Sequence, residues 1–154
     1  MSKYHKKIFN ILDGFRDNSN PIILNGGDQF FCGFCKQLRD AETTCTIFEP
    51  PNKLLINLDY GKNKKYKPSR IDFDEEIDIT NFVNFDNKQK FKYRLLSVCI
   101  YYEYSENNGH YIAYCRNKDN KWYEFNDSSC SESSKNSIYG GSPYLLLYER
   151  IIGK

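Results

Sequence analysis

A histidine and a polar pair further along the chain are the residues with the clearest potential for chemistry. His110 follows directly after Gly109, and Asn126 and Asp127 end a short apolar segment. An amide or carboxylate oxygen that accepts a hydrogen bond from one imidazole nitrogen fixes the tautomer of the ring, and the other nitrogen is then free to act as a base. The glycine is expected to leave the approach to that free nitrogen uncrowded. His110, Asn126 and Asp127 are therefore the candidate catalytic residues.

The segment between these residues is predicted to form a β-hairpin, whose register decides whether the side chains meet. We first assume that Asn117 and Asn120, which end its polar loop, pair with each other. His110 then falls opposite Asp127, and a shift of one residue places it opposite Asn126. Directly opposed residues have Cβ atoms roughly 4.5–5.5 Å apart, close enough for a hydrogen bond. On this pattern alone, a histidine at a strand end is more often structural than catalytic, so the wider sequence must decide.

A histidine base needs a nucleophile, and none of the six cysteines is recognisable as one. Cys115 lies five residues beyond His110, so on a strand it faces the opposite side. Cys99 belongs to an apolar segment and is expected in the core. Cys45 is expected on another strand, and Cys130 is expected in the Ser-rich loop that follows the polar pair.

Two further cysteines, Cys32 and Cys35, have the spacing of a metal-ligand pair. A structural zinc ion needs four ligands in a tetrahedron, and Cys45 does not complete the set. A redox-active pair is the alternative, but the surrounding sequence lacks a thioredoxin-like βαβ pattern. We therefore expect an incomplete or vestigial zinc site, and no other cofactor.

The hydrophobic pattern predicts an α+β fold, which is mainly an antiparallel β-sheet with a short N-terminal helix. The most apolar segment, residues 93–104, has apolar side chains on both faces, which is typical of a central strand. The predicted elements are a helix over residues 6–16 and extended segments over residues 54–58, 71–79, 93–104, 110–116, 121–126 and 144–148.

The composition is that of one globular domain. Of the 154 residues, 40% are hydrophobic and 27% are charged, a balance that argues against a disordered chain. The net charge of +2 gives no reason to expect nucleic acid or a membrane as a partner. The 13 tyrosines and 11 phenylalanines favour β structure. We expect a tail over residues 1–5 and a single domain over residues 6–154.

The beginning of the chain is basic but has no sustained apolar run, so neither a signal peptide nor a membrane anchor is predicted. Without a secretory signal, the cysteines are better interpreted as free thiols or metal ligands than as disulfides. We therefore expect an intracellular protein, in the cytoplasm or the nucleus.

The segments around the candidate residues match a set of sequence boxes in order. Residues 109–116 match "GHY…Y.R", residues 122–127 match "W..FND" and residues 144–148 match "aYlLfY". Residues 54–60 stand at the place of an "L.i.LkRF" box, and residues 93–98 at that of "Y.L.aV". Together these boxes resemble the ubiquitin-specific proteases, a papain-like cysteine protease family also called ubiquitin carboxyl-terminal hydrolases. The resemblance covers nearly the whole chain and corresponds to the C-terminal half of the catalytic domain, its palm and fingers.

The resemblance implies a catalytic role for each of the three candidate residues. His110 corresponds to the general base, Asn126 to the third triad member, which is Asp or Asn in this family, and Asp127 to a supporting acidic position. In the family, a cysteine thiolate attacks the isopeptide bond after the C-terminal glycine pair of ubiquitin. The histidine takes the thiol proton and later protonates the leaving lysine amine.

The resemblance also implies a role for other parts of the chain. Cys32 and Cys35 correspond to the second of two zinc-binding cysteine pairs. Residues 62–70 and 102–109 correspond to loops that grip the extended tail of ubiquitin. The expected partners are therefore ubiquitin or a ubiquitinated protein.

The cysteine box of the family, "GL.NLGNTCY.NS", has no counterpart in this chain. Two functions follow from this difference. In the first, the chain is part of an active deubiquitinase, and a second polypeptide or a longer chain completes it. In the second, it is a catalytically inactive domain that binds ubiquitin or another protein. A β-rich scaffold without any contact to ubiquitin ranks last.

Overall fold

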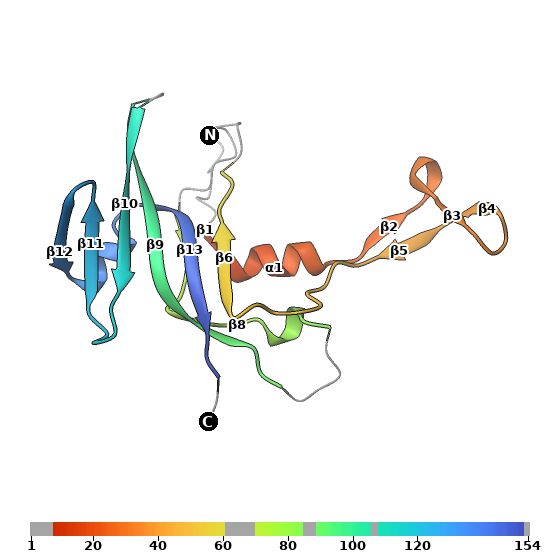
Figure 1. Ribbon diagram of the computed structural model, residues 1–154. Coiled ribbons are helices and arrows are strands. Elements are labelled where there is room, and N and C mark those ends of the chain that lie inside the picture. The colour runs from red at the N-terminus through yellow and green to blue at the C-terminus, as the bar shows by residue number, and fades with distance from the viewer. Residues whose placement is uncertain (1–7, 61–69, 85–88, 106–107, 153–154) are drawn as a thin grey trace.

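A seven-stranded antiparallel sheet forms the body of the molecule in the computed structural model (Figure 1). The structure describes residues 8–60, 70–84, 89–105 and 108–152. The strand order is β12-β11-β10-β9-β13-β6, and β8 also pairs with β9. The predicted antiparallel β fold is therefore confirmed. The strands of this sheet are β6 (Lys53–Asn57), β8 (Glu76–Asp78), β9 (Lys92–Ser105), β10 (Asn108–Arg116), β11 (Trp122–Asn126), β12 (Ser129–Ser133) and β13 (Ser142–Arg150).

Strand β9 lies in the middle of the sheet and switches its buried face halfway along. Tyr93 and Leu95 are fully buried, and so are Val98 and Ile100, so odd positions point inward first and even positions later. The ladder with β13 shifts register at Leu96, where β9 has one residue more than its partner. Such a bulge reverses the inward face. It explains why the segment is apolar on both faces, and each fully buried aliphatic side chain contributes about 1.5–3 kcal/mol.

The predicted helix is present, but it begins five residues later than expected and runs further. A short strand precedes it and pairs in parallel with β7. The backbone N–H of Leu12 donates to the side chain of Asn10 (2.9 Å), and the Asn10 N–H donates to Asp13 (3.0 Å). This capping box fixes the helix start. In the described part of the chain, no helix is long and apolar enough to cross a membrane. The elements are β1 (Ile8–Asn10), α1 (Ile11–Ser19) and β7 (Arg70–Asp72).

A narrow arm extends from the end of α1, away from the sheet (Figure 1). It consists of two antiparallel ribbons, β2 with β5 and β3 with β4. Cys45 follows this arm in irregular structure, so its predicted strand is wrong. Its elements are β2 (Ile22–Leu24), η1 (Gly26–Asp28), β3 (Phe30–Cys32), β4 (Gln37–Arg39) and β5 (Ala41–Thr43).

The Ser-rich segment before β13 is more regular than its composition suggested. It contains β12 and a short helix, η4 (Lys135–Tyr139), where a loop was predicted. Serine tolerates a strand when the neighbouring strand supplies the pairing, and β11 does so here. Ile138 of η4 is fully buried and joins the core together with Ile11 of α1. A further short helix is η3 (Thr80–Phe82).

Candidate active site

The hairpin of β10 and β11 brings His110 and Asn126 into contact, as predicted. The Nε2 atom of His110 lies 2.7 Å from Oδ1 of Asn126. The register differs from both predicted alternatives, because the Asn117 N–H donates to the Lys121 carbonyl (2.8 Å), while the Asn120 N–H donates to the Asn117 carbonyl within the turn (3.0 Å). Continued from the observed pairs, the ladder places Ile112 opposite Asn126, so the histidine reaches it diagonally. Diagonal neighbours on one face of a sheet are within reach of long side chains.

This contact defines the protonation of the imidazole. An amide oxygen can only accept, so Nε2 of His110 carries the proton and donates to Asn126. The Nδ1 atom then holds the lone pair and is the basic nitrogen. A carboxylate oxygen of Asp127 lies 3.9 Å from Nε2. The histidine side chain is 29% exposed, so the base can meet a reactant from outside.

The structure gives a reason for a glycine at position 109 that differs from the one the sequence suggested. It lies on the sheet face opposite His110, and a Cβ atom there would lie 2.2 Å from the ring of Tyr101. The tyrosine ring therefore crosses the strand where only a glycine leaves room. This ring packs against Tyr111 (4.8 Å between centroids), which packs edge-on against Tyr144 (5.1 Å). The glycine thus supports an aromatic cluster on the sheet face that points away from the His110 side chain.

This cluster forms one wall of a groove of about 530 Å³, which the sequence did not reveal. The hydroxyl of Tyr60 donates to the carbonyl of Pro143 (2.6 Å) at the groove, and burial raises the pKa of Tyr60 to about 12. The abundance of tyrosine was the one feature of the sequence that bears on the groove, and by itself it predicted β structure alone. The groove is lined by Asn57, Leu58, Asp59, Tyr60, Tyr101, Tyr111, Ser142 and Tyr144.

Two segments were predicted to be loops that grip a ubiquitin tail, and the structure describes just one of them at length. Of residues 62–70, all but Arg70 lie outside the described residues. Residues 102–109 are largely strand where a loop was expected, because β9 continues to Ser105 and β10 begins at Asn108. Long paired strands here carry the tyrosine cluster, so any binding surface at this place is the face of a sheet.

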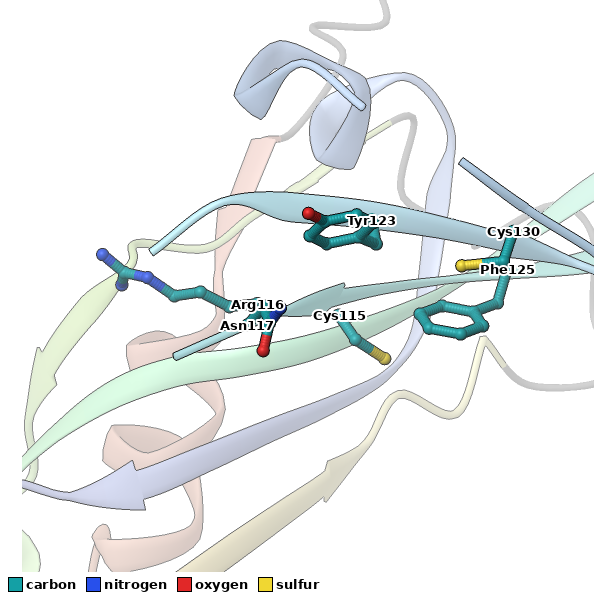
Figure 2. Close-up of a pocket in the computed structure, with 6 residues that line it drawn as sticks. All are labelled: Cys115, Arg116, Asn117, Tyr123, Phe125 and Cys130. Atoms are coloured by element: carbon teal, nitrogen blue, oxygen red, sulfur yellow. The ribbon is translucent and has the colours of Figure 1, made fainter. Parts of the chain in front are cut away.

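Three of the cysteines lie on the sheet face that points away from His110. Cys115 is opposite Tyr123, and Cys130 is opposite Phe125, so both share the face of odd-numbered β10 residues. Figure 2 shows their sulfur atoms on either side of the Phe125 ring, in a pocket of about 420 Å³. The predicted orientation of Cys115 is confirmed. Cys130 lies on a strand and faces away from the histidine.

Cys99 is also on this face, and it is only half-buried, whereas a core position was predicted. Burial nevertheless raises the pKa of its thiol. The other three cysteines lie in or beside the arm, in β3, the β3–β4 turn and the segment after β5. The structure describes all six cysteines, and none of them belongs to the sheet face that carries His110.

The turn between β3 and β4 holds Cys32 and Cys35. The N–H of Lys36 donates to the Cys32 carbonyl (2.8 Å), and Lys36 has a left-handed φ of 54°. Hydrogen bonds from the backbone N–H groups of Cys35 and then Phe34 lower the pKa of the Cys32 thiol. Zinc binds thiolates, so this turn suits two ligands of a tetrahedral site. Within the described residues, no group of three or more His, Cys, Asp or Glu side chains is placed to hold a metal.

The chain matches the model of one protein family, ubiquitin carboxyl-terminal hydrolase, over residues 8–148. Ubiquitin carboxyl-terminal hydrolase 16 of Arabidopsis thaliana is 32% identical over 146 residues, which are 90% of this chain and 14% of that protein. Ubiquitin carboxyl-terminal hydrolase 12 of Saccharomyces cerevisiae is 33% identical over 139 residues, 86% of this chain and 11% of that protein. The chain thus spans a small part of the length of these relatives.

Solved structures share the fold. The structure of the SAGA Ubp8/Sgf11/Sus1/Sgf73 DUB module bound to ubiquitin aldehyde matches with a TM-score of 0.78 and 22% sequence identity. The match covers 95% of this chain and 34% of the matched chain. A Ubp8 module bound to monoubiquitin gives the same TM-score and coverage. The expected likeness to part of a ubiquitin-specific protease fold is therefore confirmed.

Proposed function

Because this chain belongs to the ubiquitin carboxyl-terminal hydrolase family, we propose that it is the histidine-bearing part of a deubiquitinase that hydrolyses the isopeptide bond after ubiquitin. The observation that carries the proposal is the 2.7 Å contact between His110 and Asn126. It joins the two sequence boxes that correspond to the base and its partner in the family. Two solved structures that share the fold, one bound to ubiquitin aldehyde and one bound to monoubiquitin, support ubiquitin as the partner.

The mechanism follows from the protonation of His110. Its Nδ1 lone pair takes the proton of a cysteine thiol, and the thiolate attacks the carbonyl carbon of the scissile bond. The Asn126 oxygen and the Asp127 carboxylate then stabilise the imidazolium, because both lie beside Nε2–H. The imidazolium next protonates the leaving lysine amine, and water finally releases ubiquitin.

The cysteine of this mechanism comes from another polypeptide or from the rest of a longer chain. The placement of all six cysteines off the His110 face supports this part of the proposal. The same placement favours a second candidate function, a ubiquitin-binding domain without hydrolysis. The two candidates differ in whether the histidine can work when a family cysteine is present.

A chimera separates them. Residues 8–148 replace the matching segment of the yeast hydrolase 12, and cleavage of a ubiquitin–fluorophore conjugate is measured. An active chimera that loses about 100-fold or more of its rate on His110→Ala supports the enzyme. Lys118→Gln in the hairpin loop is the matched control and should keep the rate. A chimera that folds and binds ubiquitin without cleaving it supports the binding domain instead.

A further inference from the structure

A basic groove lies at the end of the sheet where β6 and β9 begin and β13 ends (Figure 1). Two hollows of about 590 and 610 Å³ form it, and they adjoin because Gln89 and Arg150 line both. The partner of His110 in the ladder is Tyr102, which lies ten residues beyond Lys92 in β9. At about 3.3 Å per residue, the basic groove is therefore roughly 30 Å from the base. A ligand bound here would lie well away from the candidate active site.

One cation of the basic groove is held in place for an anion. The guanidinium carbon of Arg150 lies 4.6 Å from the centre of the Phe91 ring, which is almost fully buried. A guanidinium that stacks on a ring keeps its N–H donors for a carboxylate. Glu149, the residue before Arg150, pairs instead with Lys53. In the part of the chain that the structure describes, no carboxylate forms an ion pair with Arg150, so its donors are available to a ligand.

Two lysines add to this charge. Lys90 and Lys92 line the hollow of about 610 Å³ together with Arg150, and no acidic residue is among its described lining residues. Asp78 stands opposite Lys92 in the ladder of β8 and β9. Although burial acts in the other direction, hydrogen bonds from Thr80 and then the charges of both lysines lower the pKa of the Asp78 carboxyl. One carboxylate thus serves two ammonium groups, and the hollow keeps an excess of positive charge.

The hollow of about 590 Å³ offers an apolar anchor point. Phe48 is 79% exposed there, and it lines the hollow together with Pro51 and Phe91. Its one acidic lining residue among those described is Glu49. Ile152, which is 76% exposed, continues the apolar surface into the cationic hollow. Exposed apolar surface with a polar rim is typical of an interaction site. A ligand that spans both hollows therefore needs carboxylates at one end and an apolar group at the other.

We propose that the basic groove binds an extended acidic segment of a partner protein, with its carboxylates on Arg150 and the two lysines and an apolar side chain against Phe48. Charge complementarity selects this occupant. A nucleic acid suits the groove less well, because sites that follow a nucleic-acid backbone combine a longer row of cations with several stacking rings. The inference goes beyond the proposed function, since the groove recruits a partner and takes no part in hydrolysis.

The test is an NMR titration of isotope-labelled residues 1–154 with octapeptides of glycine and serine around a core of four residues. The core is Glu-Glu-Leu-Glu in the first peptide, Gln-Gln-Leu-Gln in the second and Glu-Glu-Ser-Glu in the third. The first peptide should shift the signals of Arg150 and the two lysines and bind about tenfold more tightly than the second. This ratio should shrink at higher ionic strength, because salt screens exposed charges. The third peptide should bind about threefold more weakly than the first, since it lacks the apolar anchor.

Four variants assign the effect. Lys90→Gln and Arg150→Gln should each weaken binding of the first peptide about threefold. Phe48→Ala should remove the preference for leucine over serine. Lys118→Gln makes the same change of charge in the loop between β10 and β11 and should leave the affinity unchanged. Lys90 is exposed, so its variant tests the groove even if Arg150→Gln does not fold.

Four results would each overturn the inference. They are no binding of the first peptide, equal affinity of the first and second peptides, shifts confined to other parts of the chain, and tighter binding of an oligouridylate of eight nucleotides. Lys90→Gln in the chimera should leave the cleavage of the ubiquitin–fluorophore conjugate unchanged. The groove and the proposed function therefore succeed or fail in separate assays.

Discussion

The partner atom of His110 determines which of its nitrogens is basic, and this can be measured at the scale of one residue. The chain has two histidines, so a His5→Gln background leaves a single imidazole signal. For the neutral ring, we expect the Nε2–H tautomer in long-range proton–nitrogen spectra. Asn126→Ala should mix the two tautomers and cost about 0.5–1.5 kcal/mol of unfolding free energy, the value of one hydrogen bond. An unchanged tautomer in Asn126→Ala would contradict the assigned contact.

The positions of the thiols lead to a second prediction for single residues. Residues 1–154 alone should not cleave a ubiquitin–fluorophore conjugate, because no cysteine shares the His110 face. A thiol-directed ubiquitin probe should likewise leave the chain unlabelled. Turnover that disappears with His110→Ala would show that one of the six thiols reaches the base, and the probe would then identify it.

At the scale of elements, Tyr60 ties the segment that follows β6 to β13, because its hydroxyl donates to the Pro143 carbonyl. Burial raises its pKa to about 12, so the folded state favours the protonated phenol. Its contribution to stability is complete below about pH 10, the unfolded pKa, and is lost as the pH rises through the folded value. The free energy of unfolding in urea should therefore fall over this range, and Tyr60→Phe should reduce the slope. The matched control is Tyr104→Phe, at a 68% exposed position, and an equal effect of both variants would refute the assignment.

The β3–β4 turn supplies two zinc ligands where a tetrahedral site needs four. We therefore expect the isolated chain to retain well below one zinc per chain after mild chelation, as measured by elemental analysis. Cys32→Ser should not change this value. One tightly held zinc per chain would disprove the prediction, and would mean that Cys45 or a second copy completes the coordination.

At the scale of the whole molecule, the arm exposes much apolar surface for its size. Two-stranded ribbons are marginally stable by themselves, and large exposed apolar patches mark interaction sites. Such a surface fits a domain that another polypeptide covers. The apolar side chains of the arm that are more than half exposed are Ile22, Ile23, Phe30, Phe31, Phe34 and Leu38.

This surface predicts concentration-dependent association of the isolated chain. Sedimentation velocity should show oligomers that weaken with Phe34→Ser, because this side chain is 98% exposed and has little role in stability. Phe48→Ser is the matched control, since Phe48 is 79% exposed but lies outside the ribbons. Equal behaviour of the two variants would show that the arm is not the associating surface.

Local patterns in the sequence determined the kinds of elements and the residues of the candidate site. The apolar side chains on both faces of residues 93–104 predicted a central strand, and the polar loop between residues 110–116 and 121–126 predicted the hairpin that joins His110 to Asn126. The helix start was missed, because its cap depends on the hydrogen bonds of Asn10 instead of on apolar spacing. Hydrophobic periodicity indicates which face of an element is buried, but it does not indicate the residue at which the element begins.

Only the tertiary structure decided the register of the hairpin, the sheet face on which each cysteine lies and the existence of the groove. The Asn117 N–H bonds to the Lys121 carbonyl at the end of the hairpin loop, so His110 meets Asn126 diagonally. The geometry of the turn sets this register, and hydrophobic spacing does not encode it. The pairing of β12 turns Cys130 away from the base, although it lies near Asp127 in sequence. The groove combines residues 57–60, 101, 111, 142 and 144, which meet because β6, β13, β9 and β10 are neighbours in the sheet. Strand order is set by burial over the whole sheet, so sites made from distant strands exist only once the chain has folded.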